Sequence, residues 1–327
     1  MKTLSRRKLL AIAVTSLTAS ALPPRAWAET DYPNRPIKMV IPFATGGPTD
    51  IFGRLFAARL SESLGQALVP ENRGGAGSAI GMDMVAKAPP DGYTLAFGTG
   101  SIPTSAAMTK LPYDPRKDIE PIATLGIVPL VLLAAPNMPN TLSGLIDLIK
   151  KNPGKYSFGS AGNGTTTHLA SEMLKQKAGL DVVHVPYRGS GPALQDAIAG
   201  RVAFLFETIT ASKSLFTSGK LQLLAVGTKK RIALMPDVPT LAEGGVTGMS
   251  ATTWNMLFAP ARTPRPIIDR LNRVSNQILA EPEFVKRLAD LATEAVSNST
   301  PESARAFLLE ELDTCATVVK QAGLKTE

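Results

Sequence analysis

The feature that most constrains the fold of this chain is a repeated alternation of short apolar runs with segments of helical periodicity. In the first unit, residues 37–42 form an apolar run, a turn with two glycines follows, and residues 51–64 place apolar side chains three and four positions apart. Such alternation is typical of βα units in a mostly parallel sheet. It predicts further strands over residues 68–71, 94–97, 156–159, 182–186, 202–207 and 221–226, and helices around residues 84–85 and over 142–151, 166–177 and 192–199.

Two longer apolar segments divide these units into two series. Residues 119–133 and 253–259 are each long enough to pass from one series to the other. The chain has 327 residues, 44% of them apolar, which is more than one lobe usually contains. We therefore predict a two-lobed α/β fold with two interlobe crossings. Lobe 1 is expected over 29–130 plus 253–327, with C-terminal helices over 267–279, 283–291 and 301–321, and lobe 2 over 131–252.

The first 28 residues have the composition of an export signal peptide. A basic start over residues 2–8 precedes a mildly apolar stretch over 9–22, and Ala26-Trp27-Ala28 fits a cleavage site. Arg6 and Arg7 also fit a twin-arginine signal, so Sec and Tat export both stay open, and either route predicts the periplasm. Without this segment the net charge falls from +8 to about +3, which gives no reason to expect nucleic acid as a partner.

The few cysteines and histidines exclude several kinds of site. Cys315 is the single cysteine, so no intramolecular disulfide, cysteine metal cluster or lipid anchor is expected. His168 and His184 are the two histidines, and neither belongs to an H-E-x-x-H pattern, so we expect no metal site. The residues indicate no cofactor, and we expect a monomer.

Two glycine-bearing turns between a strand and a helix are the candidate binding elements. The first spans residues 43–50 and the second residues 160–167. Backbone N–H groups at such corners can converge on an anion, and ligands of open α/β sheets lie at the carboxyl ends of strands. The first turn also fits a purely structural corner in which Asp50 stabilises its helix. Glu207, at the end of another predicted strand, faces either a cleft or solvent.

Catalytic motifs are absent from the sequence. There is no G-x-S-x-G motif, and the glycines of residues 74–81 are spaced one position too far apart for a dinucleotide fingerprint. His168 and His184 are better interpreted as hydrogen-bonded structural groups than as bases. We therefore expect a binding protein and no enzyme. The alternatives are an enzyme that uses Asp50, His168 or Glu207 on a bound carboxylate, and a periplasmic ligand sensor.

Motifs along the whole chain after the signal segment resemble those of the Bug (TctC-like) periplasmic solute receptors. They comprise Tyr32-Pro33-Asn34-Arg35-Pro36-Ile37, the Pro-Phe-x-x-Gly-Gly-x-x-Asp of residues 42–50, Leu64-Gly65-Gln66, Glu71-Asn72-Arg73-x-Gly75-Ala76-Gly77, Pro90-Asp91-Gly92-Tyr93-Thr94-Leu95, Leu111-Pro112-Tyr113-Asp114-Pro115, Ser160-x-Gly162-x-Gly164-Thr165-x-x-His168-Leu169-Ala170, His184-Val185-Pro186-Tyr187-Arg188-Gly189, Gly219-Lys220-Leu221, Pro236-Asp237-Val238-Pro239-Thr240 and Ala259-Pro260.

The resemblance implies a type II periplasmic-binding-protein fold and a receptor for a tripartite tricarboxylate transporter. It implies that membrane transporter subunits are the partners and that the ligand is a small organic carboxylate: a dicarboxylate, tricarboxylate, amino acid or aromatic acid. Carried over to this sequence, the implied ligand contacts are Phe43, Ala44, Thr45, Gly46, Gly47, Asp50, Gly162, Asn163, Gly164, Thr165 and Thr166, to which we add Glu207. Thr165 stands where the family usually has Ser, and Glu207-Thr208 where it often has Asp-Asn, so the ligand's identity stays open.

Overall fold

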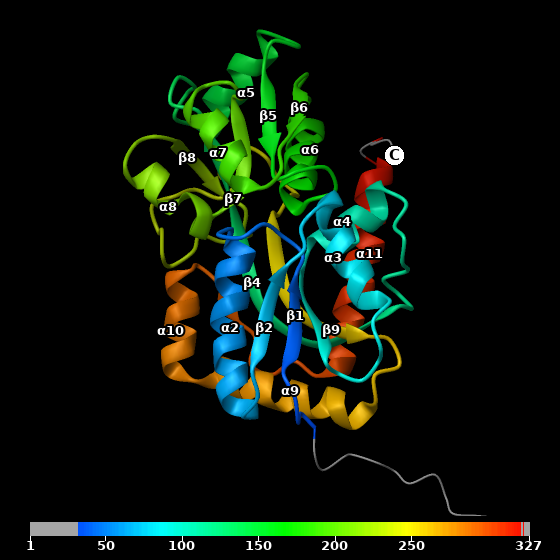
Figure 1. Cartoon of the computed structure of the whole chain (residues 1–327). Coiled ribbons are helices and arrows are strands. Elements are labelled where there is room, and N and C mark those ends of the chain that lie inside the picture. The colour runs from blue at the N-terminus through cyan, green and yellow to red at the C-terminus, as the bar shows by residue number, and fades with distance from the viewer. Residues whose placement is uncertain (1–31, 322, 324–327) are drawn as a thin grey trace, which may run out of the picture. The chain divides into compact units, whose positions relative to one another are not determined.

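The structure, a computed structural model, describes residues 32–321 and 323, and the signal peptide predicted over residues 1–28 lies outside them (Figure 1). The helices are α2 (Pro48–Leu64), α3 (Ala79–Ala86), α4 (Ser101–Met108), α5 (Leu142–Lys150), α6 (Thr166–Ala178), α7 (Ser190–Ile198), α8 (Ile209–Thr217), α9 (Arg265–Ala280), α10 (Pro282–Asp290) and α11 (Pro301–Gln321), with a short 3-10 turn, η1 (Ala76–Ser78). The strands are β1 (Ile37–Ile41), β2 (Leu68–Asn72), β3 (Thr94–Thr99), β4 (Ile119–Ala134), β5 (Ser157–Ser160), β6 (Val183–Pro186), β7 (Phe204–Thr208), β8 (Gln222–Val226), β9 (Thr252–Pro260) and β10 (Glu294–Ala295).

The described strands pair in the order β2-β1-β3-β9-β4-β7-β5-β6, with β8 and β10 also paired to β4. The groups β2-β1-β3 and β7-β5-β6 are parallel, as the βα alternation predicts. The two crossing strands, β4 and β9, pair antiparallel with each other and with their neighbours. The sheet is therefore mixed, because the crossings that join its two parts run against the parallel strands.

Strand β4 belongs to both parts of the sheet. Its residues 119–129 pair with β9, and its residues 130–134 pair with β7 and partly with β8. The division into lobes at residues 130/131 and 252/253 stays a prediction, since by their contacts the residues from Pro33 onward group as one unit.

Helices cover both faces of the strands β1 and β3. Successive side chains of a strand point to opposite faces, and in these two strands most side chains on both faces are buried. Ile41 and Phe97 face α2, where the Phe52 ring meets the Phe97 ring edge-on at 5.1 Å between centroids. On the opposite face, Val40 and Ala96 pack in one apolar cluster with residues of α3 and α11.

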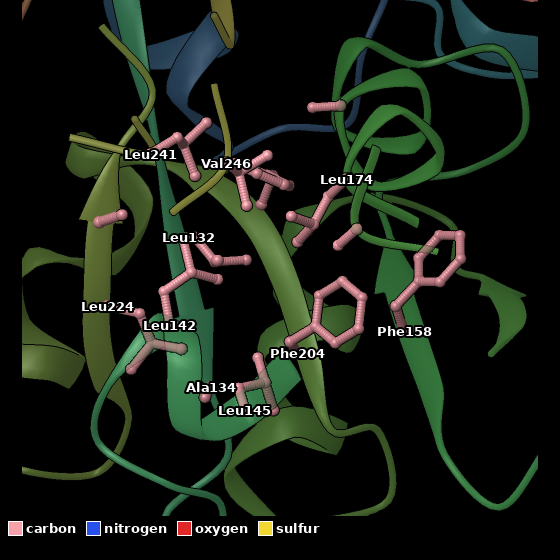
Figure 2. Packing of buried hydrophobic residues seen from close by; sticks show 14 of the residues in the cluster. Leu132, Ala134, Leu142, Leu145, Phe158, Leu174, Phe204, Leu224, Leu241 and Val246 are labelled. Atoms are coloured by element: carbon pink, nitrogen blue, oxygen red, sulfur yellow. The ribbon is translucent and has the colours of Figure 1, made fainter. Parts of the chain in front are cut away.

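The strands β4, β5 and β7 are covered in the same way. One face packs against α5 and α6, and Figure 2 shows Phe158 and Phe204 lying side by side in this cluster, with ring centroids 5.6 Å apart. The other face, which includes Leu133 and Leu205, packs against α7 and other parts of the chain. These cores fix the ends of the strands, and the turns that leave those ends form the site.

Helices α4 and α8 and strand β10 are absent from the sequence-based prediction. Helix α4 begins Ser-Ile-Pro-Thr-Ser and is mostly buried, so it has no polar face that would reveal a helical period. Helix α8 follows β7 directly, with the Thr208 hydroxyl accepting a hydrogen bond from the Ala211 amide as its N-cap.

Candidate functional site

A pocket of about 290 Å³ lies where five strand-to-helix corners meet. These corners are β1–α2, β3–α4, β5–α6, β6–α7 and β7–α8. The pocket lining also includes residues of the crossing strands β4 and β9 and of the segment before β10. The described lining residues are Phe43, Ala44, Thr45, Gly46, Gly47, Pro48, Thr49, Phe52, Thr99, Ser101, Val128, Leu130, Ala161, Thr165, Thr166, Thr167, Arg188, Gly189, Ser190, Gly191, Pro192, Glu207, Thr208, Thr210, Thr253, Asn255, Leu291 and Thr293.

The arrangement favours an anion. The first amides of a helix have no carbonyl partner within that helix, and the helix dipole adds positive potential at the same end. At the pocket, the amides of Thr49, Thr166 and Gly191 have no acceptor among the described residues. Hydroxyl groups surround them, while Phe43, Phe52 and other apolar side chains supply the rest of the wall. A volume near the lower end of the usual range for ligand sites suits a small molecule.

Asp50 stabilises the first turn without lining the pocket. Its buried carboxylate accepts hydrogen bonds from the Gly46 amide, the Arg54 guanidinium and the Asn72 amide, each at 2.8 Å. Burial alone would raise the pKa of Asp50, but the Gly46, Asn72 and Arg54 contacts outweigh it and lower that pKa. Asp50 is outside the pocket lining, so its carboxylate holds the turn in place.

The second turn is tied together by its own hydroxyls. The Thr165 hydroxyl donates to the Gly162 carbonyl at 2.7 Å, and the Ala161 amide donates to the Thr167 hydroxyl at 3.0 Å. The amides of Gly162 and Gly164 are also engaged, with Ser160 Oγ and His168 Nδ1 respectively. The amides of Gly162 and Gly164 are therefore already used within the turn, and the amides that stay available to a ligand at this corner are those at the start of α6.

Both histidines support this turn, which confirms their interpretation as hydrogen-bonded groups. His184 Nε2 lies 2.6 Å from the Ser160 hydroxyl, and His168 accepts from the Gly164 amide. Glu172 follows one helical turn later, 3.8 Å from His168 Nε2. Burial alone would raise the pKa of Glu172, but the neighbouring His168 and Lys175 side chains outweigh it and lower that pKa. Cys315 is buried among apolar side chains.

The two turns that the sequence singles out line one pocket. Of the predicted contacts, its lining contains Phe43, Ala44, Thr45, Gly46, Gly47, Thr165, Thr166 and Glu207. Asp50, Gly162, Asn163 and Gly164 are outside that lining, in the network that holds the turns. Ligand contact stays a prediction for all of these residues.

The corner over residues 187–192 lines the pocket and is missing from the predicted site. It has the same form as the other two, a strand followed by glycines at the start of a helix, and that form was the available signal. It also brings the exposed Arg188 to the pocket. Ser101, Thr208, Thr253, Asn255 and Thr293 are further polar lining residues, and they come from parts of the chain with no such motif.

Side-chain hydroxyls link the corners to each other and to neighbouring elements. The Ser105 hydroxyl of α4 lies 2.7 Å from the Gly77 carbonyl oxygen and 3.0 Å from that of Gly164. A Cβ on either glycine would come within 2.8 Å of that hydroxyl, and both glycines have positive φ, so both positions require glycine. The Thr166 and Thr253 hydroxyls lie 3.3 Å apart and join α6 to the crossing strand β9.

No group of three or more His, Cys, Asp or Glu side chains that could hold a metal ion occurs among the described residues. None of the described helices combines the length and the apolar character needed to cross a membrane.

Comparisons with known proteins give consistent results. Residues 52–324 match the model of the tripartite tricarboxylate transporter family receptor. Protein BugT of Bordetella pertussis is 36% identical over 97% of this chain and 98% of its own length. The periplasmic binding protein BugD has a solved structure that is 36% identical, with a TM-score of 0.85, and covers 90% of this chain and 100% of its own.

Two further solved structures contain ligands. Rpa4515 of R. palustris, solved with adipate, is 34% identical with a TM-score of 0.86 and covers 90% of this chain and 99% of its own. MatC from Rhodopseudomonas palustris, solved with bound malate, is 33% identical with a TM-score of 0.83 and covers 88% and 100%. The predicted α/β binding-protein fold is confirmed, and so is the expectation of a binding protein rather than an enzyme. The chain belongs to the TctC, or Bug, family of solute-binding receptors.

Proposed function

We propose that this protein captures a small organic carboxylate in the pocket between its five corners and delivers it, in the periplasm, to the membrane subunits of a tripartite tricarboxylate-type transporter. The observation that carries the proposal is the convergence of five helix N-termini on one cavity of about 290 Å³. Positive helix ends and unpaired amides compensate a carboxylate without a dedicated cation. The adipate and malate in two relatives are ligands of the same chemical class.

In this proposal the ligand's carboxylate lies against the amides at the start of α2, α6 and α7. Thr49, Thr166 and Gly191 supply these amides, and Arg188 adds a positive charge at the pocket. The apolar side chains Phe43, Phe52 and Leu130 pack against the carbon chain of the ligand. We further propose that the protein acts as a monomer.

A thermal-shift screen of the mature protein against dicarboxylates, tricarboxylates, aromatic acids and amino acids tests the proposal. An acid present at about one hundred times its Kd stabilises the native state by about 2.7 kcal/mol, which raises the melting temperature by several degrees. The matched amides, in which each carboxylate becomes a neutral carboxamide, serve as control ligands. Equal shifts with acids and amides would contradict carboxylate recognition, and no shift with any acid would contradict the proposed function.

A further inference from the structure

Glu207 is a buried acid at the pocket with one carboxylate oxygen unused. It lies at the end of β7 and is 1% exposed. Its Oε1 accepts hydrogen bonds from the Thr208 amide at 2.7 Å and the Thr208 hydroxyl at 3.2 Å. Its Oε2 is also buried but has no hydrogen-bond partner. The Ser190 hydroxyl on α7 lies close to this carboxylate and favours its ionised form.

No cation of the described residues offsets the charge of this acid. Among the described residues that line the pocket, Arg188 and Glu207 are the two with ionisable side chains. Arg188 is exposed and is not among the groups that shift the pKa of Glu207. Burial raises the pKa of the Glu207 carboxyl above its ordinary value, against the smaller effects of Ser190 and Thr208. An isolated buried carboxylate is costly, and a cation supplied by the ligand would remove that cost.

The pocket lining therefore contains two kinds of polar group. The amides of α2, α6 and α7 suit a carboxylate, whereas the free Oε2 of Glu207 needs a hydrogen-bond donor. A simple dicarboxylate offers no donor and would bring a second negative charge toward an acid. An ammonium group offers both N–H donors and the opposite charge.

We propose that Glu207 Oε2 accepts a hydrogen bond from an ammonium group of the ligand, so that this receptor selects carboxylates that carry an amine over those that do not. The inference rests on the proposed function, since it assigns the ligand's second group within the same pocket. Glu207 is then a specificity-determining residue. Asp50, the acid of the first turn, is excluded from this role because Gly46, Arg54 and Asn72 already use its carboxylate.

Calorimetry at pH 7 with matched acid pairs tests the inference: aspartate against succinate, glutamate against glutarate, and 4-aminobutyrate against butyrate. In at least one pair the amino member is expected to bind about tenfold or more tightly than its partner. The Glu207→Gln variant keeps an oxygen for the Thr208 amide, so it is expected to fold. In that variant the amino member is expected to lose about tenfold or more in affinity, and its partner is expected to bind no worse.

Glu311→Gln is the matched control, because Glu311 is a half-buried acid bonded to Trp254 outside the pocket lining. It is expected to leave the preference unchanged. Tighter binding of the nitrogen-free acid in every pair, with proton uptake measured in two buffers and with affinity retained in Glu207→Gln, would overturn the inference. That result would make Glu207 a protonated donor to a second carboxylate. Failure of all six acids to bind would instead count against the proposed function.

Discussion

The imidazole rings of His168 and His184 stack face to face, with their centroids 3.8 Å apart and their planes 12° from parallel. Phe158 continues the stack on the His184 ring at 4.8 Å. Through the Ser160 hydroxyl, His184 is connected to the turn that leads into α6. Protonating such a ring places a charge in a poorly hydrated site beside a second imidazole, so the neutral form is favoured.

The stability of the protein is expected to fall in mild acid because of His184. Burial, and next the neighbouring His168, lowers the pKa of His184 to about 3, whereas an unfolded histidine titrates near 6.5. The unfolded state therefore binds the proton first, so the contribution is complete above about pH 6.5 and is lost as the pH falls through about 3. Between pH 7 and pH 5 the loss is about 2 kcal/mol. Urea unfolding of the parent protein and of His184→Gln at both pH values checks this, and equal acid losses in the two proteins would contradict it.

The opposite pH dependence is expected from Glu207. Since burial raises the pKa of this carboxyl in the folded protein, its contribution to stability is full below the unfolded value near 4.3 and is lost as the pH rises through the folded value. Without ligand, Glu207→Gln is thus expected to gain stability relative to the parent as the pH rises from 5 to 8. Melting temperatures across this range measure the difference, and a constant difference would count against an unpaired buried acid.

Asp50→Asn is expected to destabilise the first turn. The substitution replaces a carboxylate that accepts three hydrogen bonds by an amide whose nitrogen cannot accept. A loss of about 1–3 kcal/mol in the free energy of unfolding follows, together with weaker ligand binding. The control is Asp269→Asn on α9, whose ion pair with Arg265 is exposed and whose loss is expected to cost less than about 1 kcal/mol. Equal costs for the two variants would show that the turn does not depend on Asp50.

Gly47→Val is expected to abolish binding while the protein stays folded. Gly47 is the N-cap of α2 with an ordinary φ of −77°, and a Cβ there would lie 3.5 Å from the Ala44 carbonyl oxygen, which is a normal contact. The added methyl groups of valine would stand at the pocket wall and keep a ligand away from the amides. Gly47→Ala, with a smaller side chain, is expected to lose less affinity. Calorimetry and melting temperature measure the two effects, and full affinity in the valine variant would remove this turn from the binding site.

Arg188→Gln is expected to weaken binding by a factor of about three to ten and to reduce its dependence on salt. The reason is that Arg188 places an exposed positive charge at the pocket, where it attracts an anion before contact. Arg273→Gln removes the same charge from the exposed face of α9 and serves as the control. Titrations at low and high salt measure the effect. An identical salt dependence in the two variants would show that Arg188 does not attract the ligand.

Elements with an apolar period were predictable from the sequence. The expected strand over 37–42 is β1 (Ile37–Ile41), the expected helix over 166–177 is α6 (Thr166–Ala178), and both crossings became strands. These segments are identifiable because burial on a regular period leaves its pattern in the residues themselves. Helix α4 has no such pattern, since its mixed Ser, Thr and Pro residues are buried on most sides.

The site was predictable only in part. The glycine turns were visible in the sequence because glycines between a strand and a helix allow close approach of the backbone. Which amides stay free could not be predicted: the Gly46 amide is used by Asp50 and the Gly164 amide by His168. Asn255 and Thr293 reach the pocket only through the pairing of β9 and β10 with β4, which is a long-range property of the sheet.

The Ser105 hydroxyl has one proton but two carbonyl oxygens within reach, those of Gly77 and Gly164. At any instant it can satisfy one of them, so this junction never reaches the strength of two full hydrogen bonds. The link between α4 and η1 therefore alternates with the link between α4 and the turn before α6, so these two contacts are not independent.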